Sequence, residues 1–151
     1  MMRSDFNPSA SATTVVKGSV SSVTSTAAPP SPGRSEKVRS LSTTGGYMGI
    51  KASPGAVKAG EITFNVTNDS KDTVHEMIVM YLANPGKPLP YLEAENRVDE
   101  DKAGDKGEVS ELDPGKSGTL TVELKAGKYL LICNVPGHYG AGMWAEFTVE
   151  P

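Results

Sequence analysis

Apolar and polar residues alternate along several short segments of this chain. Residues 62–67, 119–124 and 143–150 place an apolar side chain at every second position. Residues 75–81 and 128–133 are almost wholly apolar, and each run follows a turn signal rich in Asn, Asp, Ser or Gly. A period of two is typical of a strand with one buried face. The pattern therefore predicts at least five strands.

No segment shows a convincing helical period, so the strands are expected to form an all-β fold, an antiparallel β-sandwich. Residues 83–107 are the exception, because they are acidic and rich in Pro and Gly. This stretch is expected to form a long loop or to contain one short helix around residues 91–101.

Residues 1–36 differ in composition from the rest of the chain. They contain thirteen Ser or Thr and four Pro without a regular apolar period, which predicts a disordered leader or linker. The leader lacks the continuous apolar run of a secretory signal, so any signal or anchor has been removed or replaced, and nothing follows about export. Residues 37–151 are expected to form the folded domain.

Length and charge limit the classes of function. The chain has 151 residues, enough for one domain. No apolar run approaches the 18 or so residues of a membrane-spanning helix. The chain has a net charge of −3 and no cluster of Lys or Arg that could bind a phosphate backbone, so nucleic acid is not an expected partner.

One segment near the C-terminus carries three side chains that can bind metals. Cys133 ends an apolar run, a Pro-Gly turn presents His138, and Met143 opens the last strand. A thiol, an imidazole and a thioether thus lie in one hairpin loop. His75, the only other histidine, begins an apolar strand directly after a turn and is expected at an end of the sandwich.

Two imidazoles, one thiolate and one thioether suit a copper ion that alternates between Cu(I) and Cu(II). Soft sulfur favours Cu(I), imidazole binds both states, and two His with one Cys and a weak axial Met suit electron transfer. We therefore expect one copper ion at His75, Cys133, His138 and Met143. Strand ends hold such ligands nearly fixed, which favours fast electron transfer.

At these residues the chain resembles the cupredoxin, or blue (type 1) copper, family from about residue 38 to residue 151. The resemblance rests on residues 57–68, on His75, on residues 127–133 and on the loop to Met143, whose two four-residue gaps are similar to those of longer-loop members. It implies a Greek-key β-sandwich, with Cys133 as the thiolate and Met143 as the axial ligand.

By the same resemblance, His75 and His138 are the first and second imidazole ligands. Many family members place Asn or Ser directly after the first ligand, where a side chain can hydrogen-bond near the thiolate. Here that position is Glu76. The environment that tunes the metal is therefore expected to differ from theirs.

Taken singly, each candidate ligand has an ordinary interpretation. Cys133 alone is typical of a small packed hydrophobe, His138 of a turn residue and Met143 of a core filler. The copper hypothesis rests on all of them occurring together at matching offsets in one Gly-rich loop.

Three other features leave alternatives open. Met48, Met77 and Met80 are a possible copper-carrying methionine set, although Met77 shares a strand face with His75 and is expected in the core. Trp144 is expected to be packing or surface cover. Residues 93–113 hold nine acidic and three basic residues, which form either a solvated loop or a docking patch for a basic redox partner.

The leading functional hypothesis is a monomeric one-electron carrier between redox partner proteins, such as cytochromes or copper oxidases and reductases. The alternative is an exported copper carrier or chaperone with the same fold. An enzyme is not expected, because a trinuclear copper cluster needs more histidines and a dinuclear centre needs a second cysteine. A copper thiolate beside a stalk-like leader favours an exported protein, either periplasmic or associated with the outside of a membrane.

Overall fold

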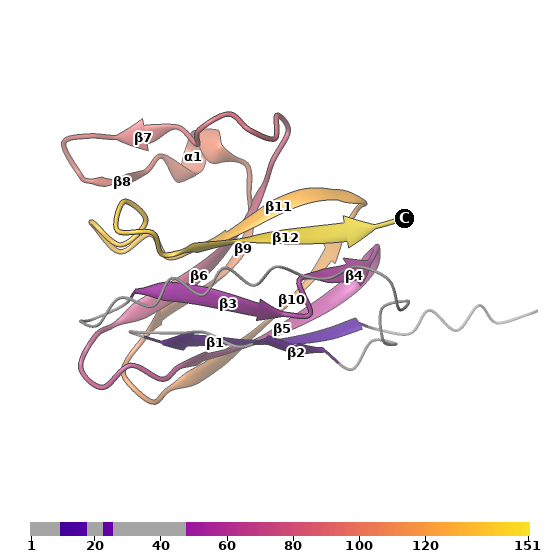
Figure 1. The fold of residues 1–151 in the computed structure, drawn as a ribbon, viewed down its shortest axis with the longest axis horizontal. Coiled ribbons are helices and arrows are strands. Elements are labelled where there is room, and N and C mark those ends of the chain that lie inside the picture. The colour runs from indigo at the N-terminus through magenta and orange to yellow at the C-terminus, as the bar shows by residue number, and fades with distance from the viewer. Residues whose placement is uncertain (1–9, 18–22, 26–47) are drawn as a thin grey trace, which may run out of the picture.

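The computed structural model describes residues 10–17, 23–25 and 48–151, which form two packed β-sheets (Figure 1). The first sheet has five strands: β10 (Ser117–Leu124), β5 (Gly60–Asn68), β1 (Ala10–Lys17), β2 (Val23–Ser25) and β3 (Gly49–Ser53). The second also has five: β4 (Ala56–Lys58), β12 (Trp144–Glu150), β11 (Gly127–Ile132), β6 (His75–Tyr81) and β9 (Asp105–Leu112). The prediction of an all-β sandwich is confirmed.

The strand pairing is mixed, which corrects the expectation of a wholly antiparallel fold. β1 pairs with β5 in parallel, and β4 pairs with β12 in parallel, while the other pairs within the two sheets are antiparallel. A period of two reports which face of a strand is buried and carries no information on the direction of its neighbour. The two parallel pairs join segments that lie far apart in the sequence.

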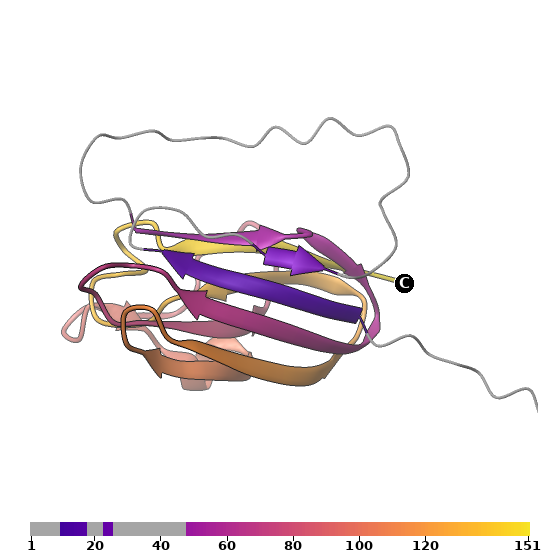
Figure 2. The same ribbon diagram turned by 90° about the horizontal axis from the view of Figure 1, so that it is seen from below.

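Two strands lie inside the segment predicted as a disordered leader. β1 runs between β5 and β3, and β2 pairs with β1 (Figure 2). For residues 10–17 and 23–25 the prediction is therefore wrong. These residues are rich in Thr, Val and Ser and form strands because β5 offers an edge for pairing, which composition alone does not reveal. The rest of the leader lies outside the described residues, and the division at residues 36 and 37 stays a prediction.

The inner faces of the two sheets form one hydrophobic core. The alternating residues of β5 and β12 point inward as predicted, and the rings of Phe64 and Phe147 pack across the sandwich with centroids 5.2 Å apart. Met77 and Val79 of β6 join them, and so does Leu131 of β11. Burying these side chains holds the sheets together and fixes the ends of β6, β11 and β12 relative to one another.

Residues 82–104, the β6–β9 connection, cover the outer face of the second sheet. They contain the small hairpin of β7 (Tyr91–Leu92) and β8 (Arg97–Val98) and the helix α1 (Glu100–Ala103). Figure 1 shows these elements on the side of β6 and β11 away from β5. A second hydrophobic cluster lies beneath them and contains Ile78, Met80, Leu89, Val98, Ala103 and Ile132.

The expected short helix exists but lies later than predicted, because residues 91–98 form the hairpin instead. The Asp99 side chain accepts a hydrogen bond from the main-chain N–H of Lys102 at the start of α1, and Gly104 ends the helix in a left-handed conformation. No helix within the described ranges is long and apolar enough to cross a membrane.

β9 was not predicted from the sequence. Only Val109 of its eight residues is buried, because the strand forms an edge of the second sheet and pairs with β6 alone. With so few apolar positions the strand shows no period.

Candidate metal centre

Two of the three strong donors predicted from the sequence lie at strand ends, and the third lies in the adjoining loop, all at one end of the sandwich. His75 is the first residue of β6, and Cys133 directly follows the end of β11. β6 and β11 are antiparallel neighbours, with Ile132 opposite Ile78, so these two ends meet. His138 lies in the loop that follows Cys133.

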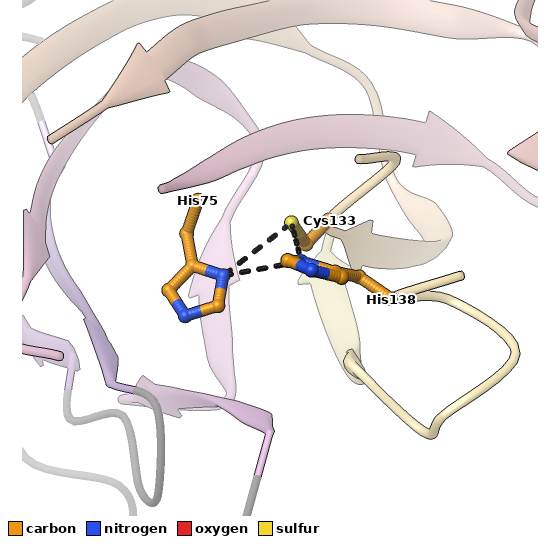
Figure 3. Close-up of side chains that lie close together, drawn as sticks. All are labelled: His75, Cys133 and His138. Atoms are coloured by element: carbon orange, nitrogen blue, oxygen red, sulfur yellow. Dashed lines mark hydrogen bonds between the residues drawn. The ribbon is translucent and has the colours of Figure 1, made fainter. Parts of the chain in front are cut away.

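The three side chains converge on one point (Figure 3). Nδ1 of His75 lies 3.3 Å from Nδ1 of His138, and Sγ of Cys133 lies 3.9 Å and 3.4 Å from these two nitrogens. A circle through the three atoms has a radius of about 2.1 Å, close to the 2.0–2.3 Å of metal–imidazole and metal–thiolate bonds. The donor set therefore fits one metal ion.

Met143 closes the same loop and is fully buried. Its main-chain O accepts a hydrogen bond from Cys133 N at 3.0 Å, and its N–H donates to the carbonyl O of His138 at 3.1 Å. The backbone thus holds Met143 beside the strand end that carries the thiol. The structure brings all four predicted residues to one end of the sandwich.

Burial differs sharply between the two histidines. The side chains of His75 and Cys133 are fully buried, whereas His138 is partly exposed. Nε2 of His75 has no hydrogen-bond partner among the described residues. A metal bound at Nδ1 leaves the proton on Nε2, so this buried N–H has no protein acceptor in the described part of the chain.

Burial sets the protonation of the metal-free site. Burial, and next the charge of His138, lower the pKa of His75 to about 4, and burial also lowers the pKa of His138. Burial raises the pKa of the Cys133 thiol to about 11. At neutral pH the site therefore holds two neutral imidazoles and a protonated thiol, and a metal ion needs to displace only the thiol proton.

Comparison with known proteins identifies the fold. Residues 103–151 match the family model described as "Sulfocyanin (SoxE) domain". Over 41 residues the chain is 49% identical to the copper-resistant cuproprotein CopI of Pseudomonas aeruginosa and 51% identical to auracyanin-B of Chloroflexus aurantiacus. Each match covers 26% of this chain, but only 23% of the first relative and 17% of the second. The chain thus matches less than a quarter of the length of either protein.

The structure is also similar to rusticyanin from Thiobacillus ferrooxidans, with a TM-score of 0.53 and 15% identity over 93% of this chain and 77% of that one. Reduced rusticyanin gives a TM-score of 0.54 and 16% identity over 93% and 79% of the two chains. The chain therefore has the cupredoxin fold. The resemblance to longer-loop cupredoxins is confirmed.

Glu76, the residue that departs from the pattern of many cupredoxins, still places a donor at the thiolate. Its main-chain N–H lies 3.5 Å from Cys133 Sγ and donates to it. Its carboxylate accepts a hydrogen bond from Asn134 N at 3.1 Å. Because the donor to sulfur is a backbone group, the position can hold Glu without losing this interaction.

The Glu76 carboxyl group is itself perturbed. Burial, and next the charges of Glu100 and Glu108, raise its pKa to about 7, against the opposing effect of the Asn134 hydrogen bond. The acidic stretch predicted as a solvated loop or a docking patch thus contributes carboxylates near the candidate metal centre.

Asn134 is a residue of the site that the sequence analysis missed. Its side chain is buried and bonds to both main-chain groups of Val98 and to Glu100. Its position directly after Cys133 was the single signal available in the sequence, and the partners of its side chain depend on the β6–β9 connection.

The three methionines considered as a copper-carrying set do not come together. Met77 lies in the core between the sheets, whereas Met80 belongs to the cluster beneath the β6–β9 connection, on the opposite face of β6. Met48 packs against the first of these clusters. Trp144 is 44% exposed and pairs with Ile132, so it covers the outer face of the second sheet, consistent with surface cover.

Proposed function

We propose that this cupredoxin is a mononuclear type 1 copper protein that carries single electrons between redox partner proteins. The observation that carries the proposal is the convergence of two imidazole nitrogens and one thiol sulfur at one end of the sandwich, at separations of 3.3–3.9 Å. When bound there, copper supplies a one-electron Cu(I)/Cu(II) couple.

His75, Cys133 and His138 are proposed as the three strong ligands, and Met143 as the weak axial ligand. The role of Met143 is supported by its place at the end of the ligand loop, where its backbone pairs with that of Cys133. Three of the four residues are fully buried within a packed sandwich. Such packing keeps their side chains nearly fixed, so little reorganisation accompanies a change of charge.

His138 is proposed as the exit for the electron, because it is the more exposed of the two histidines. The loop from Cys133 to Met143 contains no charged residue. Its exposed positions include Pro136 and Ala141, which leaves an uncharged surface through which a partner can approach closely. A small contact of this kind suits a short-lived redox complex.

The remaining functional statements are also proposals. The protein acts as a monomer without substrate turnover of its own, and its partners are proteins of the cytochrome or copper oxidase and reductase type. It is exported, to the periplasm or to the outer side of a membrane, since a copper thiolate beside a Ser/Thr/Pro-rich leader suits that location.

A copper carrier is the second candidate, and one observation favours it: the local identity of 49% to a protein named for copper resistance. Carriage requires ligands that an acceptor can reach and exchange. The full burial of His75 and Cys133 opposes exchange, so we favour electron transfer.

An absorption spectrum of the copper-loaded protein tests the proposal. We expect an intense visible band from thiolate-to-Cu(II) charge transfer, and we expect Cys133→Ser to lose it. The fold should survive in this variant, because a hydrophobic core between the sheets holds the sandwich together, unlike a zinc finger. Far-UV circular dichroism of the variant is the control. A colourless, weakly held ion in the wild type would support a carrier instead, and a coloured Cys133→Ser variant would refute the ligand assignment.

A further inference from the structure

Asn134 uses both ends of its side-chain amide to bind a segment outside the sandwich. Oδ1 accepts a hydrogen bond from the main-chain N of Val98 at 2.7 Å, and Nδ2 donates to the carbonyl O of the same residue at 3.0 Å. Nδ2 also donates to Oε1 of Glu100 at 2.6 Å. Asn134 is 1% exposed, so water cannot replace these bonds if the side chain is removed.

A second attachment lies three residues further along the ligand loop. The N–H of Gly137 donates to the carbonyl O of Asn96 at 2.7 Å. Asn96 lies in the turn of the β7–β8 hairpin with a φ of 54°, a left-handed conformation that Asn tolerates better than most residues. The Tyr91 ring, whose hydroxyl donates to Asn96, also packs on Tyr139. The β6–β9 connection therefore holds the loop on both sides of His138.

Asn134 also connects the loop to the strand that carries His75. Its main-chain N–H donates to the carboxylate of Glu76, whose own N–H donates to the sulfur of Cys133. Asn134 thus joins β6, the ligand loop and the β6–β9 connection at the position directly after Cys133.

We propose that Asn134 is a positioning residue of the copper centre, which fastens the ligand loop to the β6–β9 connection and thereby fixes Cys133 and His138. This inference rests on the proposed function. The loop contains three glycines, at positions 137, 140 and 142, whose backbones are free to move unless hydrogen bonds hold them. The bonds of Asn134 supply that restraint, and the β6–β9 connection is part of the metal centre although it provides no ligand.

Asn134→Ala tests the proposal. Loss of a partner that orients a metal ligand typically weakens metal binding about 10- to 100-fold, and we expect that loss for Cu(I) in competition with a chelator. The visible thiolate band should shift or weaken. In the metal-free protein, the Gly137 amide should exchange with solvent at least about tenfold faster, because the loop opens more often. Asn84→Ala, an exposed Asn in the same connection, is the matched control and should change none of these quantities.

A second pair of variants decides the matter if Asn134→Ala does not fold. Glu100→Ala removes one of the three side-chain bonds and should reproduce the three effects in weaker form, whereas Glu100→Gln keeps an acceptor oxygen and should keep the wild-type rate of Gly137 exchange. Wild-type affinity, spectrum and Gly137 exchange in the folded alanine variants would overturn the positioning role. If the wild type lacks the thiolate band, the proposed function fails, and the Gly137 exchange rate still decides whether Asn134 restrains the loop.

Discussion

Copper binding is expected to release one proton, from Sγ of Cys133, at every pH between about 7 and 8. The pKa of this thiol is raised to about 11 by burial, so the thiol is protonated throughout that range. The pKa of His75 is lowered to about 4, and that of His138 is lowered below its ordinary value, so both imidazoles are mainly neutral from pH 7 upward. The apparent affinity should therefore rise tenfold for each pH unit.

The size of the effect follows from the same values. At pH 7 the thiol lies about four units below its pKa, and each unit corresponds to about 1.4 kcal/mol, so forming the thiolate costs about 5 kcal/mol. An unperturbed cysteine with a pKa near 8.5 would require only about 2 kcal/mol. Burial of Cys133 thus lowers the apparent affinity at neutral pH, and the strength of the metal–thiolate bond must offset that loss.

The assay is anaerobic competition for Cu(I) against a chelator of known protonation constants at several pH values between about 7 and 8. Titration calorimetry in two buffers of different ionisation enthalpy counts the released protons independently. Cys133→Ser is the control, because it removes the proton and should bind weakly with little dependence on pH. A release of two protons near pH 7 would refute the conclusion that burial keeps both imidazoles neutral, and a release of none would show that the thiolate exists before metal binds.

Three further changes have defined outcomes. Met143→Leu should keep copper and colour and raise the reduction potential in voltammetry, since losing a donor sulfur disfavours Cu(II); a lower potential or loss of metal would contradict an axial role. Ala141→Asp should slow electron exchange with a partner protein while the spectrum stays unchanged. Docking through the acidic stretch predicts instead that the exchange rate depends strongly on salt and is unaffected in this variant. Glu76→Gln should stabilise the metal-free protein against urea by about 1–3 kcal/mol at pH 8 and by almost nothing at pH 4. The reason is that the carboxyl pKa of about 7 lies above its usual value, so ionisation of Glu76 destabilises the fold as the pH rises through 7. A stabilisation by Glu76→Gln that is the same at pH 4 and pH 8 would contradict this account of Glu76.

Features that depend only on neighbouring residues could be predicted from the sequence. The period of two in β5, β10 and β12 reports a buried face on each strand, and the structure buries those faces between two sheets. The spacing of Cys133, His138 and Met143 places them in one loop whatever surrounds it. Both inferences are local, since a strand of given period and a loop of given length restrict what the chain can do over ten residues.

Which distant segments meet could be learned only from the folded structure. β1 became a strand because β5 offered it an edge, and β9 formed an edge strand with a single buried residue; neither leaves an apolar period in the sequence. The separation of 3.3 Å between His75 and His138 likewise requires the antiparallel pairing of β6 with β11. The direction of a strand's neighbour is set by long-range contacts, which one segment of sequence does not encode.

The same reason explains the electrostatics of the site and the role of Asn134. Cysteine and histidine have ordinary pKa values in an extended chain, and only the burial that folding imposes moves those of Cys133 and His75. The amide of Asn134 bonds to Val98 because two hydrophobic clusters bring the β6–β9 connection over the second sheet. The local sequence therefore predicts which side chains can act as ligands. Their distances, their protonation and the restraint on the ligand loop arise from packing between segments that are remote in the chain.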